Sequence, residues 1–175
     1  SETARCGEIV KNLLAFSRQS KINIESRKIK EIVDRTLTLL SHDLKLKGVQ
    51  VVKHVHSDLP NVQCDFKQIQ QALLNVIGNA SEAMVEGGVL TMAAKRSAKG
   101  RTMEIRISDT GCGIPTAHLK SIFEPFFTTK EEGKGVGLGL SVVYGIVTRH
   151  KGTIKVESEP GEGTTFTIHL PLAVI

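Results

Sequence analysis

Apolar and polar side chains alternate strictly through residues 103–109, which read MEIRISD. Successive side chains of a strand point to opposite faces, so Met103, Ile105 and Ile107 share one apolar face, and Asp109 belongs to the same set. A strand patterned in this way must have its apolar face covered, which restricts the chain to a sheet with a packed layer on one side. The pattern also aims a carboxylate at the core side of that sheet, just before the glycines of DTGCGIP free the backbone to turn.

The spacing of apolar residues elsewhere supplies the covering layer and the remaining strands. Helices are predicted over residues 4–18, 29–46, 65–85 and 137–150, and one short helix is predicted near residues 117–123. Strands are predicted over 49–55 and 62–64, in a hairpin of 89–97 with 101–109, and in a closing hairpin of 152–158 with 164–170. Helices and strands are grouped and do not alternate, so the expected fold class is α+β: a two-layer α/β sandwich whose mixed, mostly antiparallel sheet is covered on one face by helices.

Composition narrows the class of protein. The chain has 175 residues, which suits one domain plus a short appendage, and no run is long and apolar enough to suggest a membrane segment. Its odd number of widely spaced cysteines indicates neither a disulfide framework nor a zinc site, so a cytoplasmic setting is expected. The net charge of +5 suits a phosphorylated ligand, whereas nucleic acid is not expected as a partner, because the basic residues are scattered and aromatic residues make up only 4%.

The helix predicted after Asp65 carries amides beside its apolar stripe. Gln71, Asn75 and Asn79 follow one another at a spacing of four, which places them along one edge of the helix. Asn is a poor residue for a helix interior, so these side chains call for partners. An Asn carbonyl can bind a hard cation such as Mg²⁺ directly or through water, but two hydrogen-bonded structural amides would give the same pattern.

A glycine-rich run, GKGVGLGLS over residues 133–141, opens directly into the next predicted helix. Unpaired backbone N–H groups at a helix N-terminus are a ready site for phosphate. The run is not a Walker loop, because Thr128 stands where the first glycine is needed and Gly135 follows Lys134. The hinge of a flexible lid is the other interpretation of these glycines.

Taken in order, these segments resemble the signatures of the superfamily that joins gyrase B, Hsp90, the histidine kinases and MutL (GHKL). The signatures are an N box (QALLNVIGNASEAM), a first glycine box (DTGCGIP), an F box (IFEPFFTTK), a second glycine box (GVGLGLS) and a terminal GEGTTF, and they cover residues 65 to 170. Within the superfamily the chain resembles the catalytic ATP-binding domain of sensor histidine kinases, particularly the nitrogen-regulator type. The resemblance implies a Bergerat-type ATP-binding fold, with ATP and Mg²⁺ as cofactors.

The resemblance also implies roles for individual residues. Asp109 would accept a hydrogen bond from the exocyclic amine of adenine, with Thr164 beside it, and Gly111 and Gly113 would let the backbone pass close to the base. Asn79 would be the Mg²⁺ ligand. No residue is assigned a certain catalytic role; the complete ATP-binding set implied is Asn75, Asn79, Asp109, Gly111, Gly113, Ile114, Lys130, Gly135, Gly137, Leu138, Gly139, Leu140 and Thr164.

The residue at position 75 separates branches of the superfamily. Hydrolytic members carry Glu there as a general base, and an amide cannot take a proton from water. The implied function is therefore that of a protein-histidine kinase, which transfers the ATP γ-phosphoryl group to a His on a dimerisation domain for relay to a response regulator. The alternatives are a regulatory ATP/ADP-binding module without transfer and an ATPase of the same superfamily. One departure from the family pattern is Glu82, since many relatives carry a basic residue three or four positions after Asn79.

Residues 1–21 resemble the end of a dimerisation helix, which divides the chain into that fragment and a catalytic domain, residues 22–175. None of the histidines has the His-Glu-x-x-x-Pro setting of a phosphoacceptor, so all are interpreted as surface or structural residues, and the chain alone is not expected to phosphorylate itself. The implied partners are the phosphoacceptor domain of the same protein, in a homodimer, and a receiver domain. A cytoplasmic location is expected for this part, and the full-length protein is compatible with membrane anchoring.

Overall fold

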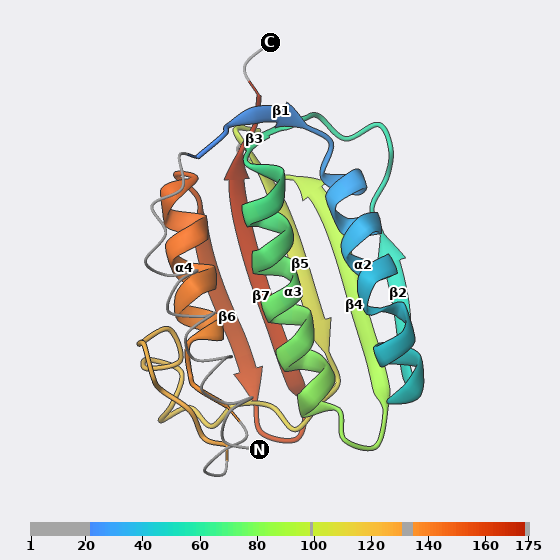
Figure 1. The fold of residues 1–175 in the computed structure, drawn as a ribbon, viewed down its shortest axis with the longest axis vertical. Coiled ribbons are helices and arrows are strands. Elements are labelled where there is room, and N and C mark those ends of the chain that lie inside the picture. The colour runs from blue at the N-terminus through green and yellow to red at the C-terminus, as the bar shows by residue number, and fades with distance from the viewer. Residues whose placement is uncertain (1–21, 99, 131–134, 174–175) are drawn as a thin grey trace, which may run out of the picture.

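The computed structural model describes residues 22–98, 100–130 and 135–173, and in these ranges it shows the expected two-layer sandwich (Figure 1). The predicted helix over residues 4–18 and the predicted dimerisation segment lie outside the described residues. The elements are β1 (Glu25–Arg27), α2 (Ile29–Leu46), β2 (Val49–His54), β3 (Val62–Cys64), α3 (Phe66–Ala83), β4 (Gly88–Arg96), β5 (Thr102–Asp109), α4 (Gly139–Arg149), β6 (Thr153–Glu159) and β7 (Gly163–Pro171). The predicted α+β fold is confirmed.

The main sheet has the strand order β2-β4-β5-β7-β6. β2 and β4 pair in parallel and all other neighbours are antiparallel, which makes the sheet mixed, and β1 pairs with β3 in a separate short ribbon. In Figure 1, α2, α3 and α4 lie side by side across one face of the sheet. The residues predicted to share the apolar face of β5 are buried, and Asp109 is buried with them at 7% exposure.

α3 is the central helix of the covering layer, and its sequence explains both its start and its orientation. The Asp65 side chain accepts a hydrogen bond from the backbone N–H of Gln68 at 3.1 Å, which satisfies one of the free donors at the helix N-terminus. The apolar stripe faces the sheet: Ile69, Ala72, Leu73, Val76, Ile77 and Ala80 are all buried. The other edge of α3 therefore carries Asn75 and Asn79 toward α4.

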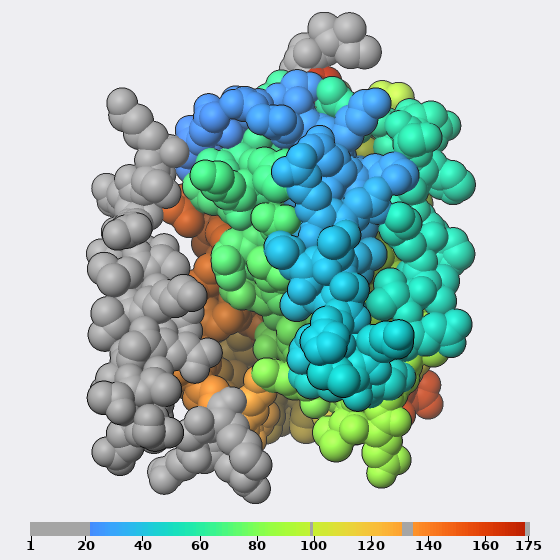
Figure 2. All heavy atoms as spheres, turned by 45° about the vertical axis from the view of Figure 1, so that its right-hand side comes forward, coloured from blue at the N-terminus to red at the C-terminus, as the bar shows by residue number. Residues whose placement is uncertain are grey.

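α2 covers the outer part of the sheet, between α3 and the β2 edge, as Figure 2 shows. Asp34 joins it to that edge, because its carboxylate pairs with Lys30 on the same helix and with Lys53 on β2 at 2.5 and 2.6 Å. Burial tends to raise the pKa of Asp34, but the hydrogen bonds from both lysines outweigh it and lower that pKa. In the described ranges, no helix has the length and apolar character needed to cross a bilayer.

The segment predicted as a short helix near residues 117–123 is instead a series of turns. Most of its backbone bonds join residues three positions apart, as from Leu119 N–H to Thr116 and from Ser121 N–H to His118. Side-chain packing holds it in place, since Ile122 is buried and Phe123 contacts the rings of Phe166 and Tyr144. The segment is fixed by its contacts with β7 and α4 and does not depend on helical hydrogen bonds.

A matched pair of glycines in the β6–β7 turn tests how the end of β7 is held. Gly161 and Gly163 both have positive φ, at 83° and 100°, but a Cβ on Gly161 would meet open space, whereas one on Gly163 would lie 2.0 Å from the carbonyl oxygen of Asp109. We expect Gly161→Ala to lower the free energy of unfolding by about 1 kcal/mol, the usual penalty for left-handed backbone. Gly163→Ala should lower the free energy of unfolding by about 2 kcal/mol more than Gly161→Ala does, because the β5 and β7 backbones must move apart to admit the Cβ. Overpacking penalties in protein interiors are typically of about this size.

Urea unfolding followed by circular dichroism measures both changes in the free energy of unfolding. Equal losses for the two variants would contradict the close approach of β7 to Asp109.

Candidate functional site

Asp109 ends β5 at the point where the sheet opens into loops. The register pairs it with Thr164 on β7, and its Oδ1 accepts hydrogen bonds from the backbone N–H of Gly111 at 2.9 Å and of Thr164 at 3.3 Å. In the described part of the chain, Oδ2 accepts no hydrogen bond. One carboxylate oxygen is thus fixed by the backbone, and the other is left for a donor supplied by a ligand.

Burial sets the electrostatics of this carboxylate. It raises the pKa of Asp109 above the ordinary value of 3.8, and the hydrogen bonds from Gly111 and Thr164 offset part of that rise. A buried acceptor favours a ligand that brings a hydrogen-bond donor. The exocyclic amine of adenine is a donor of this kind, whereas guanine carries a carbonyl oxygen at the equivalent position.

Asp109 lies in the wall of a cavity of about 680 Å³, a size ordinary for small-molecule sites. Most of the residues implied at the sequence level line it together: Asn79, Asp109, Gly113, Ile114, Lys130, Gly135, Gly137, Leu138, Gly139, Leu140 and Thr164. Asn75 and Gly111 do not line it. Gly111 contributes its N–H to Asp109, so it acts on the cavity through that side chain.

Ser158 on β6 fixes the wall beside Asp109, and sequence reasoning did not single it out. Its Oγ donates to the Gly163 carbonyl at 2.8 Å and accepts from the Ile114 N–H at 2.8 Å; it also lies 3.0 Å from the Thr164 Oγ1. The hydroxyl therefore ties the first glycine box to the terminal hairpin. A lone serine in a strand gives no sequence signal, because its importance depends on residues from two distant segments.

The N-terminus of α4 faces the same cavity. Leu138, Gly139 and Leu140 line it, and no side chain in the described ranges caps the first turn of this helix. The Ser141 hydroxyl donates to the Leu138 carbonyl at 2.9 Å. The first N–H groups of α4 and the positive end of its dipole are therefore suited to an anion such as a phosphate.

Asn75 joins α3 to α4 from outside the cavity. Its Nδ2 donates to the Gly139 carbonyl at 3.1 Å, and its Oδ1 accepts from Gln71 Nε2 at 3.0 Å. Asn79, one turn later, lines the cavity and makes no hydrogen bond within the described residues. The two amides were predicted as a pair, and the structure gives them different surroundings: both ends of the Asn75 amide are hydrogen-bonded within the protein, whereas Asn79 is available to a ligand.

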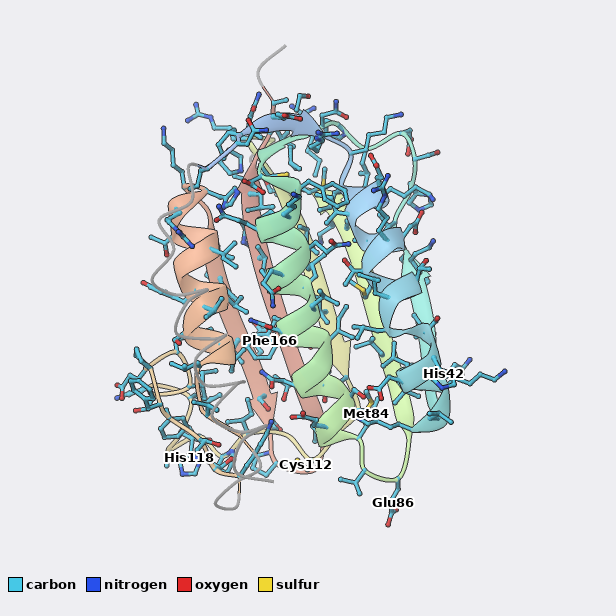
Figure 3. All side chains as sticks on the ribbon, in the orientation of Figure 1. His42, Met84, Glu86, Cys112, His118 and Phe166 are labelled. Carbon is cyan, nitrogen blue, oxygen red and sulfur yellow. The ribbon has the colours of Figure 1, made fainter. Side chains whose placement is uncertain are left out.

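Two histidines, His150 and His118, have different surroundings in the structure. His150 is structural, as predicted: it is buried, its Nδ1 lies 2.7 Å from the Ile146 carbonyl, and its Nε2 accepts from the Asp65 N–H at 2.9 Å. His118 was also interpreted as a surface or structural residue, yet it lines the cavity and packs edge-on against Phe127 with ring centroids 5.5 Å apart. Figure 3 shows His118 and Cys112 together at the end of the molecule where β5 stops.

One backbone hydrogen bond joins the two ends of the loop that runs from Phe126 to Gly137. The Phe126 N–H donates to the Gly137 carbonyl at 2.9 Å, and both residues have positive φ, 69° and 70°. A Cβ at position 137 would lie 2.5 Å from the Phe126 carbonyl carbon, so only glycine permits this approach. Within the loop, Lys130 pairs with Glu82 on α3, and both side chains line the cavity.

Comparison with known proteins places this site in a family. Residues 64–174 match the model of the histidine kinase-, DNA gyrase B-, and HSP90-like ATPase family. The chain is 36% identical to the sensor histidine kinase ZraS of Escherichia coli (strain K12) over 173 residues, which covers 99% of this chain and 36% of ZraS. The chain thus spans about a third of the length of that relative.

Solved structures agree with the sequence match. Full-length ShkA in complex with AMPPNP superposes with a TM-score of 0.81 at 28% identity, covering 96% of this chain and 36% of ShkA. The histidine kinase ThkA in complex with the response regulator protein TrrA also gives 0.81, at 26% identity, covering 98% of this chain and 48% of ThkA.

Asp109→Asn tests the selectivity of the buried carboxylate. The Asn Oδ1 would keep the two backbone hydrogen bonds, so its Nδ2 would point at the ligand and oppose the adenine amine donor-to-donor. We expect the Kd for AMPPNP to rise roughly a hundredfold, about 3 kcal/mol for a lost charged hydrogen bond. Calorimetric titration of both proteins with AMPPNP and with the corresponding GTP analogue measures the change. The control is Asp58→Asn, which makes the same substitution at an exposed position.

If Asp109→Asn bound AMPPNP as tightly as the unsubstituted chain, the carboxylate would not be the base-recognising group. A relative gain for the GTP analogue is expected, because its carbonyl oxygen would meet the new amide donor.

The raised pKa of Asp109 predicts how stability depends on pH. The folded chain holds this proton more tightly than the unfolded chain, so the stabilising contribution is complete below the ordinary value of 3.8 and is lost as pH rises through the raised folded-state pKa. Asp109→Asn cannot titrate. Its free energy of unfolding should therefore increase relative to the unsubstituted chain between pH 4 and neutrality, as urea unfolding at a series of pH values would measure.

A constant difference in the free energy of unfolding across that pH range would show that Asp109 has an ordinary pKa in the folded chain.

Proposed function

This chain belongs to the histidine kinase-, DNA gyrase B-, and HSP90-like ATPase family and is the catalytic ATP-binding domain of a sensor histidine kinase; on that premise we propose that it positions ATP for transfer of the γ-phosphoryl group to a histidine on a dimerisation domain of the intact protein. The adenine would lie against Asp109, with Thr164 beside it. The phosphates would extend toward Lys130 and the N-terminus of α4. ShkA, a structure similar to this chain, was solved with the ATP analogue AMPPNP, which supports this assignment.

The surroundings of Asn75 carry the proposal of transfer instead of hydrolysis. Hydrolysis requires a group that takes a proton from the attacking water, and the family resemblance places that group, a glutamate, at position 75. Here the position holds an amide with both ends hydrogen-bonded, to Gly139 and to Gln71, and it does not line the cavity. The site can hold ATP without activating a water from this position, as a kinase must until its acceptor arrives.

The cavity also suits a magnesium ion. No group of three or more His, Cys, Asp or Glu in the described ranges could cage a metal, so an ion would depend mainly on phosphate oxygens and water, as Mg²⁺ in nucleotide sites does. Asn79 has a side-chain oxygen that makes no hydrogen bond in those ranges and lies on the cavity wall. We propose that Asn79 holds Mg²⁺, whose chemical contribution when bound is to neutralise charge on the β- and γ-phosphates.

Two partners follow from the proposed reaction. The donor site needs a phosphoacceptor histidine, which we place on a dimerisation domain of the same protein, in a homodimer. ThkA, which is similar to this chain, was solved with a response regulator, so we propose that the phosphoryl group passes onward to an Asp of a receiver domain. We place the domain in the cytoplasm, where ATP is supplied and where Cys64 and Cys112, free in the structure, stay reduced.

Labelling with γ-³²P-ATP and Mg²⁺ tests transfer. The intact protein is expected to acquire an acid-labile, base-stable phosphohistidine outside residues 1–175, and the 175-residue chain alone is expected to acquire none. Asp109→Asn in the intact protein should abolish the label by removing nucleotide binding.

The other outcomes separate the alternatives. Phosphate release without protein labelling would identify an ATPase, and nucleotide binding with neither release nor label would identify a regulatory module. Stable label on the 175-residue chain alone would contradict the assignment of its histidines.

A further inference from the structure

The cavity has few basic side chains for a site proposed to bind a triphosphate. Among the described lining residues, Lys130 is the one basic side chain apart from His118, and two carboxylates, Asp109 and Glu82, face the same space. Asp109 lies at the base-recognising end, next to Thr164. Glu82 lies on α3 with Asn79, at the end where the proposed function places the phosphates.

Glu82 and Asn79 share one side of α3. Residues three positions apart on a helix are neighbours, and both of these line the cavity. Asn79 makes no hydrogen bond in the described ranges, while Glu82 pairs with Lys130 from the loop that ends at Gly137. The Glu82 and Lys130 side chains remain 48% and 39% exposed, so solvent screens the pair and it can exchange partners readily.

A triphosphate entering this cavity meets a repulsive carboxylate and a lysine that is already paired. A divalent cation reverses both effects, because a carboxylate is a preferred oxygen ligand for Mg²⁺ and would sit one turn from the Asn79 carbonyl. Lys130, released from Glu82, would then be available to a phosphate oxygen. The same side chain therefore opposes the bare nucleotide and favours its metal complex.

We propose that Glu82 makes nucleotide binding conditional on the divalent cation, by holding Lys130 in the absence of ligand and turning to the cation, directly or through water, when the metal–nucleotide complex binds. The proposal rests on the nucleotide site described under the proposed function. Glu82 is thus a specificity-determining residue that separates Mg–ATP from free ATP. By linkage, the nucleotide must raise the affinity for Mg²⁺ by the same factor as Mg²⁺ raises the affinity for the nucleotide.

Calorimetric titration of the 175-residue chain with AMPPNP, in Mg²⁺ and in EDTA, gives the ratio of the two dissociation constants. We expect Glu82→Gln to reduce that ratio by about five- to tenfold, at the lower end of typical coupling between two ligands, chiefly by tightening binding in EDTA. Glu82→Lys should reduce it further. Adenosine, which has no phosphate, should bind all of these proteins equally in both buffers.

Glu86→Gln is the matched control. It makes the same change of charge just beyond the end of α3, at an exposed residue that does not line the cavity and that points away from the molecule in Figure 3. An unchanged metal ratio in Glu82→Gln would overturn the proposal, as would an equal change in Glu86→Gln. Equal weakening of Glu82→Gln in both buffers would also overturn it, since that would show a purely structural role.

The adenosine arm distinguishes this failure from failure of the proposed function. If the unsubstituted, folded chain bound neither adenosine nor AMPPNP in either buffer, the nucleotide site itself would be refuted, and the role of Glu82 with it. Adenosine binding together with an unchanged AMPPNP ratio would refute only the role of Glu82.

Discussion

The site depends on one unfavourable placement, a carboxylate buried at the end of an apolar row. Asp109 continues the row of Met103, Ile105 and Ile107, and no lysine or arginine of the described residues neutralises it. It is held by two backbone N–H groups, from Gly111 and Thr164, and so its position is set by the β5–β7 register and by the turn that follows β5. The strands that build the core therefore also determine where, under the proposed function, a ligand's donor would have to lie.

The elements and the burial of Asp109 could be predicted from sequence because they depend on local patterns. Strand parity placed Asp109 on the buried face, Asp65 marked the start of α3, and the glycines of DTGCGIP marked the turn. The prediction of a short helix near residues 117–123 was wrong, because aromatic packing of Phe123 on Phe166 outweighs the weak local preference for a helix. Helical spacing in so short a segment cannot be separated from a series of turns.

The phosphate end was less predictable because its contacts join distant segments. Asn75 and Asn79 have the same sequence signal, and only the approach of Gly139 to α3 shows that the first is engaged in structure. Glu82 was visible as a departure from the family pattern, but its pairing with Lys130 needs the loop to be placed across the cavity. His118 and Ser158 gave no signal at all, because single polar residues in turns and strands acquire a role only through their neighbours.

The backbone bond between Phe126 and Gly137 has a consequence for how proteins of this type can diverge. This bond holds the two ends of the intervening segment together. The turns that follow β5 and the start of α4 therefore keep their relative positions whatever the length of chain between them. Loop closure depends only weakly on length. Residues inserted between these two positions therefore need not displace Phe126 or Gly137, whereas removing Lys130 or its neighbours would take away part of the cavity wall.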